Sequence, residues 1–528
     1  MDDFFFGKLT GVVLLSAALS VLGAWLLAWR FRRAMRALMS RPGLPVGEAP
    51  APSLALATPS VPTIPSAADD RRASLHMAAL VIAVSVLVAL TGAVLWTRID
   101  GRDPVTPLGA LARGIFYLWP VIPVLGLLRR WSLARMVATL LLWCLVVLPF
   151  LIWRAPESAT VAGMAKLLAW EIGPTFVLVG FLCMGNASRA IAPWLLAPLF
   201  VLLWAAFTGL DFLTRMVRPD WAGFDEAAAS LNAVDRLVGY NPLVQGALVV
   251  LIFLLFMAVP CALAWRPLKW LTRQLAAAHS RQWLSEVPVL LTTVWGLSLL
   301  HKAIAIGNAA MLLPLLWIPV AMLLVRALRR PADRVPTLLV LRVFQRDRAM
   351  RLLFDTLIER WRLCGNTLLI AGTDLLERTL GADDIFTFLH GRLAERFIFA
   401  ADQIPARVAA FKLAPDVEGR YRINECYCHD STWRETLAAL LARSDVALMD
   451  LRSFQRRNEG CSFELGELAR APHLTRVVLL TDGQTDLAAA RAAAAAAPAG
   501  RFLWLDATDV DRARRRQVLD ALFAAAST

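Results

Sequence analysis

Residues 443–470 read RSDVALMDLRSFQRRNEGCSFELGELAR, and this stretch decides the fold that we predict. The short apolar run 446–449 is typical of a strand buried on both faces, and Asp450 follows at its carboxyl end. The polar loop ends in turn-forming residues, after which Ser462 is predicted to be the N-cap of a helix. Glu464 would then lie in the first helical turn, where the helix dipole favours an ionised carboxylate. Both carboxylates are therefore expected at the crevice beyond the strand ends, where open α/β sheets bind ligands.

Strand and helix patterns alternate on both sides of this stretch, over residues 335–528. Most of the segments between the strands have helical spacing, whereas 401–430 is irregular apart from one strand. This alternation predicts an α/β domain with a parallel, doubly wound sheet, flavodoxin-like in general plan. The predicted strands are 337–344, 367–371, 420–426, 446–449, 476–480 and 502–505.

The chain before residue 326 is far more apolar. Of all 528 residues, 58% are hydrophobic and only 18% are charged, which is too apolar for an ordinary soluble protein. We therefore predict an α-helical polytopic membrane region, with runs long enough, or nearly so, to cross a bilayer. The first span and its basic flank occupy 1–40, a Pro- and Ala-rich linker 41–73, about eight further spans 74–327, and the α/β domain 335–528. The predicted spans are 9–31, 74–97, 110–128, 136–153, 166–185, 190–210, 243–265, 285–303 and 306–326.

The charge pattern predicts an orientation. The formal net charge of +14 needs no nucleic-acid partner, because Lys and Arg gather in the cytoplasmic loops of membrane proteins. Asp2 and Asp3 precede the first span, and Arg30, Arg32 and Arg33 end it, which places the N-terminus outside. After nine spans the α/β domain is cytoplasmic. We expect a multi-pass protein of a cell inner membrane, with the lipid bilayer as a partner.

The quoted stretch resembles the active-site segment of the nucleoside 2-deoxyribosyltransferases. In that family an aspartate ends a strand, and a segment of the form Asp-Ser-Gly-Thr-x-Phe-Glu-Leu-Gly carries the glutamate that attacks the sugar. Here residues 458–466 read NEGCSFELG. The stretch also resembles TIR domains, a related flavodoxin-like family, whose NAD-cleaving members carry this glutamate in a Cys-x-x-Glu-Leu motif. Cys461, Glu464 and Leu465 match that motif, and residues 344–347 (FQRD) are similar to the loop that opens TIR domains.

The resemblance implies cleavage of an N-glycosidic bond. Glu464 would be the catalytic carboxylate that stabilises positive charge on the sugar or forms an ester with it, and Asp450 would hold a ribose hydroxyl. The transferases have Asp where this chain has Asn458, so an acid that protonates a neutral leaving base is missing. Nicotinamide in NAD is already cationic, which favours NAD or a related dinucleotide as substrate. Glu459 could replace the missing acid, so nucleosides stay open as substrates.

The two family motifs also imply which residues bind the nucleotide ligand. Gly460 would let the backbone approach that ligand closely. Sites of these families are completed by neighbouring subunits, so the resemblance implies a homo-oligomer. The expected substrate-binding residues are Phe344, Arg346, Asp347, Asn458, Gly460 and Cys461.

Other functions remain open. Residues 426–430 read CYCHD, a single short cluster without a second ligand pair, so no metal site is predicted. No P-loop or Gly-rich dinucleotide motif is present, and no cofactor is expected beyond NAD as a possible substrate. The domain could sense nucleotides or act as a scaffold without turnover. It could also regulate a transporter, for which Glu171 is the candidate intramembrane group unless it is structural, near an interface or paired with Lys166. His301 and Lys302 are predicted to be interfacial.

Overall fold

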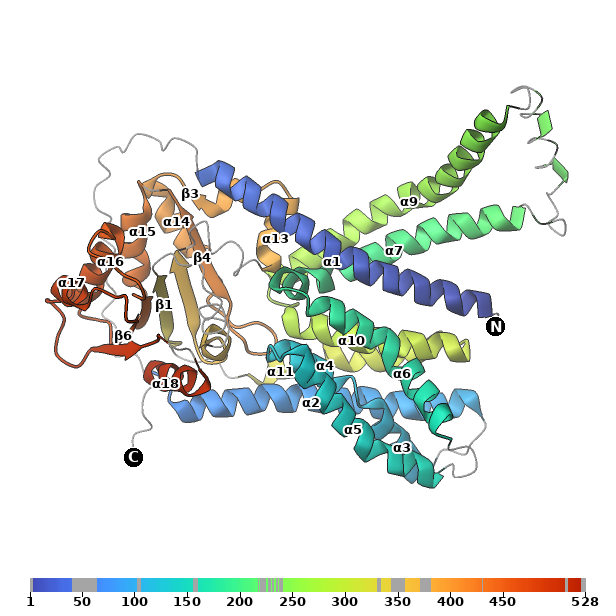
Figure 1. The fold of residues 1–528 in the computed structure, drawn as a ribbon, viewed down its shortest axis with the longest axis horizontal. Coiled ribbons are helices and arrows are strands. Elements are labelled where there is room, and N and C mark those ends of the chain that lie inside the picture. Colours follow the sequence, from blue (N-terminus) through green and yellow to red (C-terminus); the bar gives the residue numbers. More distant parts are fainter. Residues whose placement is uncertain are drawn as a thin grey trace.

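The structure is a computed structural model with two parts, a helical region and an α/β domain (Figure 1). It describes residues 3–39, 64–101, 106–154, 160–216, 241–329, 334–342, 357–370, 381–429, 431–508 and 511–523, and a few single residues between 218 and 236.

Long apolar helices build the first part. Eight described helices have the length and hydropathy to cross a membrane, and a shorter apolar run, Leu133–Pro149, corresponds to one more predicted span. The chain is therefore a multi-pass membrane protein with a helical membrane region. The elements are α1 (Asp3–Met39), α2 (Ala67–Asp100), α3 (Pro107–Tyr117), α4 (Val121–Leu128), α5 (Leu133–Arg154), α6 (Val161–Leu182), α7 (Asn186–Met216), α9 (Pro242–Ser280), α10 (Glu286–Ile306), η1 (Ala309–Leu316) and α11 (Trp317–Leu328).

Local sequence fixes where several of these helices begin. Ser66 caps α2, because its hydroxyl accepts the Asp69 N–H at 3.2 Å and the Asp69 carboxylate accepts the Ser66 N–H at 2.9 Å. α2 therefore begins before the predicted boundary at residue 73. The predicted third span consists of α3 and α4, since Pro120 has no backbone N–H with which to continue a helix.

Consecutive membrane helices alternate in direction, so their ends gather on two sides. The ends of α1, α4, α9 and α11 and the beginnings of α2 and α10 lie on the side of the α/β domain, whereas the N-terminus lies at the far side of the helices (Figure 1). This arrangement agrees with the predicted alternation of spans, in which the N-terminus and the α/β domain are on opposite sides of the membrane.

The α/β domain contains a seven-stranded sheet within the described residues. All paired strands run parallel, in the order β3-β4-β2-β1-β5-β6-β7, so the predicted parallel α/β sheet is confirmed. The two-residue strand β3 was not predicted. The strands are β1 (Thr337–Arg342), β2 (Asn366–Ile370), β3 (Phe397–Ile398), β4 (Ile423–Cys428), β5 (Val446–Asp450), β6 (Arg476–Thr481) and β7 (Phe502–Asp506). The helices are α13 (Ala382–Leu389), α14 (Ile404–Ala409), α15 (Trp433–Leu441), α16 (Glu459–Arg470), α17 (Leu487–Ala493) and α18 (Arg512–Leu522), with short 3-10 turns η3 (Leu393–Arg396) and η4 (Ala401–Gln403).

The central strands bury both faces. Along β1, Leu338 and Val340 belong to one hydrophobic core, and Leu339 and Leu341 belong to another, as the two-residue period of a strand requires. The first core includes α18 and is continuous with the core of the membrane helices. The second is covered by α15 and α16. Helices therefore cover both faces of the sheet, and the domain packs directly on the membrane region.

The amino ends of the strands face the membrane helices. Arg420, which lies just before β4, pairs with Glu286 at the start of α10 at 3.0 Å. Arg360, which precedes β2, pairs with Asp70 in α2. Since all strands are parallel, their carboxyl ends lie at the opposite edge and point away from the membrane region.

Candidate functional site

The strand order of the sheet reverses between β1 and β5. From β1 the chain proceeds to β2 on one side, where β3 and then β4 follow, and afterwards to β5, β6 and β7 on the other side. In open α/β sheets this switch point forms the crevice that binds ligands. Asp450 ends β5 there, in register with Arg342 of β1. The prediction that Asp450 lies at the carboxyl end of a buried strand is confirmed.

The charge of Asp450 is compensated locally. The residue is only 3% exposed. Its Oδ1 accepts the backbone N–H of Arg452 at 3.1 Å and lies 3.1 Å from the Nε of the same arginine. A ribose hydroxyl at this position would therefore meet an acceptor whose orientation is already fixed by an ion pair.

The helix that follows begins earlier than predicted. α16 starts at Glu459 with Asn458 at the N-cap position, and Ser462 lies within the helix, where its hydroxyl donates to the Asn458 carbonyl at 3.3 Å. The loop closes sooner because the Asn458 side chain accepts the Gln455 N–H at 2.8 Å. Glu464 is thus in the second turn. The prediction that the helix dipole favours its ionised form is wrong, since that effect fades beyond the first turn.

Glu464 is instead an enclosed carboxyl group. Burial raises the pKa of Glu464 to about 8. Its Oε2 is buried and has no hydrogen-bond partner among the residues that the structure describes. A carboxyl group that loses water without gaining donors prefers its protonated form, so Glu464 is mainly neutral at pH 7 in the ligand-free protein. A cationic ligand beside this oxygen would reverse that preference.

The Cys461 thiol is within electrostatic range of both carboxyl groups. Burial, together with the charges of Glu464 and Asp450, raises the pKa of the Cys461 thiol to about 12. Both carboxyl groups are therefore near enough to act on one thiol, so three predicted site residues share one neighbourhood. A thiol with this pKa is not a nucleophile at neutral pH, and Cys461 belongs to the core beneath α16.

Gly460 is exposed near the start of α16. An added Cβ there would come no closer than 3.9 Å to the Trp433 ring, so no described neighbour requires glycine at this position. A requirement for Gly460 would have to come from a ligand.

Three further predicted site residues follow β1 in the sequence. Phe344, Arg346 and Asp347 lie outside the described residues. The last described residue before them, Arg342, ends β1 beside Asp450.

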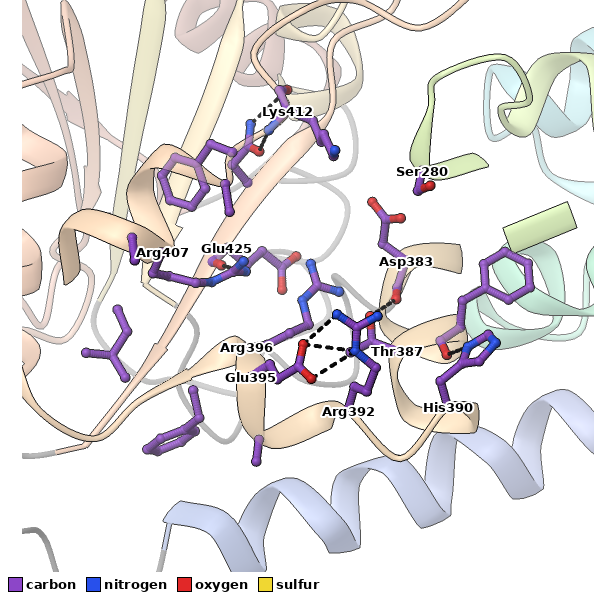
Figure 2. A pocket seen from close by; sticks show the side chains of 18 of the residues that line it. Ser280, Asp383, Thr387, His390, Arg392, Glu395, Arg396, Arg407, Lys412 and Glu425 are labelled. Carbon is purple, nitrogen blue, oxygen red and sulfur yellow. Dashed lines mark hydrogen bonds and ion pairs between the residues drawn. The ribbon is translucent and has the colours of Figure 1, made fainter. Parts of the chain in front are cut away.

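A cavity lies at the β3–β4 edge of the sheet. It measures about 900 Å³ and is lined by residues of β3, β4, α13, α14 and the end of α9 (Figure 2). Arg392 pairs with Glu395 at 2.7 Å, and Arg396 pairs with Asp384. Arg407 donates from Nη2 to a backbone carbonyl of β4 at 2.9 Å, whereas its buried Nε has no partner among the described residues. These pairs leave a polar cavity whose lining carries both positive and negative side chains.

Sequence reasoning missed this cavity, because its walls come from a segment with no clear periodicity. The available signal was the density of charged residues between 392 and 425, most of which lie in the segment predicted to be irregular apart from one strand. Asp450 and Glu464 do not line the cavity.

The membrane region contains a buried ion pair. Glu171 of α6 pairs with Lys302 of α10, and both side chains are 1% exposed. Trp119 Nε1 donates to Glu171 at 3.3 Å, and the Lys302 ammonium lies 4.4 Å from the centre of the Tyr117 ring. Glu171 thus pairs with Lys302 and not with Lys166. The prediction of an interfacial Lys302 is wrong, because α10 continues past this residue and holds it between helices.

Among the described residues, no group of three or more His, Cys, Asp or Glu side chains is placed to hold a metal ion.

Comparisons with known proteins returned no match. No protein-family model, curated protein or solved structure resembles the chain significantly.

Proposed function

We propose that the α/β domain is a membrane-anchored, TIR-like module that cleaves the N-glycosidic bond of NAD or a related dinucleotide, with Glu464 as the catalytic carboxylate. The observation that carries this proposal is the enclosed Glu464 carboxyl group, whose Oε2 lacks a partner among the described residues. It is near enough to Asp450, at the switch point of the sheet, for both to affect the Cys461 thiol. The sequence around it has the spacing that resembles the two nucleotide-cleaving families.

The strand order supports a nucleotide site. Strands β2-β1-β5-β6-β7 follow the 2-1-3-4-5 order of flavodoxin-like domains, and we propose that β4 and β3 are additions outside β2. With β4 included, the order is 3-2-1-4-5-6, as in dinucleotide-binding sheets. Both orders put the crevice between β1 and β5. Residues 342–347 contain no glycine, so Arg346 is our candidate for the contact with phosphate.

The proposed reaction uses the unusual state of Glu464. A cationic nicotinamide riboside unit beside Glu464 lowers the pKa of its carboxyl group, since an opposite charge favours ionisation. The carboxylate then stabilises the positive charge that spreads over the ribose as the bond to nicotinamide breaks. The bonding electron pair leaves with nicotinamide, which departs neutral. Water adds to the anomeric carbon and loses a proton, while Asp450 orients a ribose hydroxyl. The products are nicotinamide and ADP-ribose.

We further propose that the domain faces the cytoplasm from an inner membrane, with the N-terminus outside. Arg32 and Arg33 near the end of α1, and Arg129 and Arg130 after α4, lie on the domain side of the helices. The positive-inside rule assigns that side to the cytoplasm. The carboxyl edge of the sheet would then be accessible to nucleotides in the cytoplasm.

The main alternative is a nucleotide sensor or scaffold without turnover. One observation favours it: without ligand, Glu464 is mainly neutral and Asp450 is paired with Arg452. A regulated transporter is the other alternative. The pairing of Glu171 with Lys302 favours a structural role for that glutamate.

Nicotinamide release by the full-length protein in nanodiscs tests the proposal. The wild type should release nicotinamide from NAD, and Glu464→Gln should abolish release while leaving NAD binding intact. Glu467→Gln is the matched control, because Glu467 lies on the same helix and pairs with Arg470. Asp450→Asn should raise KM for NAD. A homo-oligomeric site further predicts that specific activity rises with protein concentration.

The outcomes separate the hypotheses. Equal release by wild type and Glu464→Gln would remove Glu464 from the mechanism. If the protein binds NAD without cleaving it, the hypothesis of a nucleotide sensor is supported. Solute flux in liposomes that depends on Glu171 would support the transporter.

A further inference from the structure

A second large cavity lies where the membrane helices meet the α/β domain. It measures about 890 Å³ and is formed by the beginning of α2, the α4–α5 turn, the α6–α7 turn and residues of the domain. Apolar spans end at Leu128 and Leu182, beside this cavity. The site is therefore at the level of the membrane surface, on the domain side.

Positive charge dominates the lining. Seven arginines line the cavity, whereas Glu359 is the only acidic residue of the lining. Glu359 pairs with Arg130 and Arg362, each at 3.1 Å, and with Arg420. Although burial raises the pKa of Glu359, the arginines around it lower that pKa far below its usual range. The one carboxylate of the lining is thus already paired with arginines.

Several arginines of the lining have no carboxylate partner among the described residues. Arg129 is one, and burial followed by the charges of Arg360 and Arg135 lowers the pKa of its guanidinium. Arg135 lies over the Trp131 ring, with its guanidinium carbon 4.3 Å from the ring centre. Like charges gathered without matching acids form a site for an anion, and guanidinium groups suit phosphate oxygens.

Two of the apolar side chains that line the cavity are exposed. Leu133 is 41% exposed and Met184 is 57% exposed, and both line the cavity at the ends of membrane helices. A small soluble phosphate would leave this surface in water. A ligand with hydrocarbon chains beside its phosphate would cover it.

The turn that carries the arginines is held in a defined conformation. Arg130 has φ of 53°, in the left-handed region that a non-glycine residue rarely adopts. The next residue, Trp131, donates its N–H to the Gly126 carbonyl at 2.8 Å, and Arg130 reaches Glu359 of the domain. A side chain at Gly126 would collide with Met136, so the helices on either side of the turn are closely packed. The arginine positions are therefore fixed before any ligand arrives.

We propose that this cavity binds the phosphate headgroup of an anionic phospholipid, whose chains lie against Leu133 and Met184. Arg129 and Arg135 come from the membrane region, and Arg515 comes from the domain, so one lipid headgroup joins both parts. This inference is independent of N-glycosidic cleavage.

The test uses the full-length protein, purified in a mild detergent. Binding of phosphatidylglycerol and of phosphatidylcholine is measured by native mass spectrometry, and inorganic pyrophosphate is added as a soluble competitor. The wild type should bind phosphatidylglycerol at least about tenfold more tightly than phosphatidylcholine. The variant Arg129→Gln/Arg135→Gln should weaken phosphatidylglycerol binding by about thirtyfold, since each basic residue at an anionic surface contributes about fivefold.

A matched variant removes the same charge elsewhere. Arg266→Gln/Arg281→Gln changes two exposed arginines, one within α9 and one just past its end, that do not line the cavity. This variant should bind phosphatidylglycerol as the wild type does. Equal binding of the two lipids by the wild type, or equal losses in both double variants, would overturn the proposal. Displacement of the lipid by pyrophosphate at equal concentration would also overturn it, in favour of a soluble phosphate ligand. If Arg129→Gln/Arg135→Gln fails to fold, two measurements on the wild type still test the proposal: its preference for phosphatidylglycerol over phosphatidylcholine, and the competition with pyrophosphate.

Discussion

Replacing Glu464 by glutamine should stabilise the α/β domain, and increasingly so as the pH rises. Burial gives Glu464 a pKa of about 8 in the folded protein, whereas the ordinary value is 4.5. The folded state therefore holds this proton more tightly than the unfolded chain does. Folding stability is unaffected below about pH 4.5 and falls as the pH rises toward 8. One pKa unit corresponds to about 1.4 kcal/mol, so the loss is about 3 kcal/mol at pH 7 and reaches at most about 5 kcal/mol above pH 8.

Pulse proteolysis in urea measures this effect on the full-length protein in nanodiscs, because the protease cleaves only unfolded domain. Between pH 6 and pH 9, the free energy of unfolding of the wild type should fall by about 2–3 kcal/mol more than that of Glu464→Gln. The control Glu467→Gln should follow the wild type, since Glu467 is paired with Arg470. Parallel pH profiles for wild type and Glu464→Gln would refute the reasoning that Glu464 is an enclosed, unpartnered acid.

Three further changes test the packing of the two parts. Glu171→Gln leaves the Lys302 ammonium buried without its counter-charge, which should cost about 3–5 kcal/mol and lower the thermal unfolding midpoint in detergent. Asp445→Asn removes the carboxylate that accepts the first N–H of β1 at 2.8 Å, which should cost about 1–2 kcal/mol in the proteolysis assay. Gly209→Ala places a methyl group against the Phe256 carbonyl, so α7 and α9 must move apart. This separation should cost about 1–3 kcal/mol of stability, and a spin-label distance measured between the two helices should increase.

Each of these changes has a control. Adding Lys302→Gln to Glu171→Gln should restore part of the lost stability, because no charge is then left unpaired. Arg334→Gln should have a smaller effect than Asp445→Asn, since the Arg334 side chain is 37% exposed. Gly173→Ala should change little, since nothing lies within 4 Å of the added carbon. If any control variant is perturbed more strongly than the variant with which it is compared, the contact behind that prediction is contradicted.

The sheet was predictable from sequence because its signal is local. Val446 to Met449 is apolar at every position, and a strand covered on both faces requires that pattern. The start of α16 was not predictable in the same way. Ser462 and Asn458 are both good N-cap residues, and the choice depends on how the preceding loop closes. That closure includes a bond from the Ser453 N–H to Asp482, 29 positions away in sequence.

The site was predictable in part for the same reason. Asp450 follows from the end of a strand, whereas the raised pKa of Glu464 depends on the side chains that enclose it. The pairing of Glu171 with Lys302 joins residues 131 positions apart, and no periodicity indicates which membrane helices are neighbours. Local pattern thus located the carboxylates, and tertiary packing decided their charge.

The sheet is attached to the membrane region by the edge opposite its proposed nucleotide site. Arg329, just past α11, donates to the Asp416 and Val417 carbonyls at 2.8 and 3.1 Å, in the segment that leads to β4. Arg334 joins the chain before β1 to Asp445 at the start of β5 at 2.7 Å. β1 is hydrogen-bonded to β2 on one side and to β5 on the other, so a force on these arginines acts on several strands at once. Movement of the membrane helices would thereby reach the sheet as a mechanical load, with no messenger passing between the two parts.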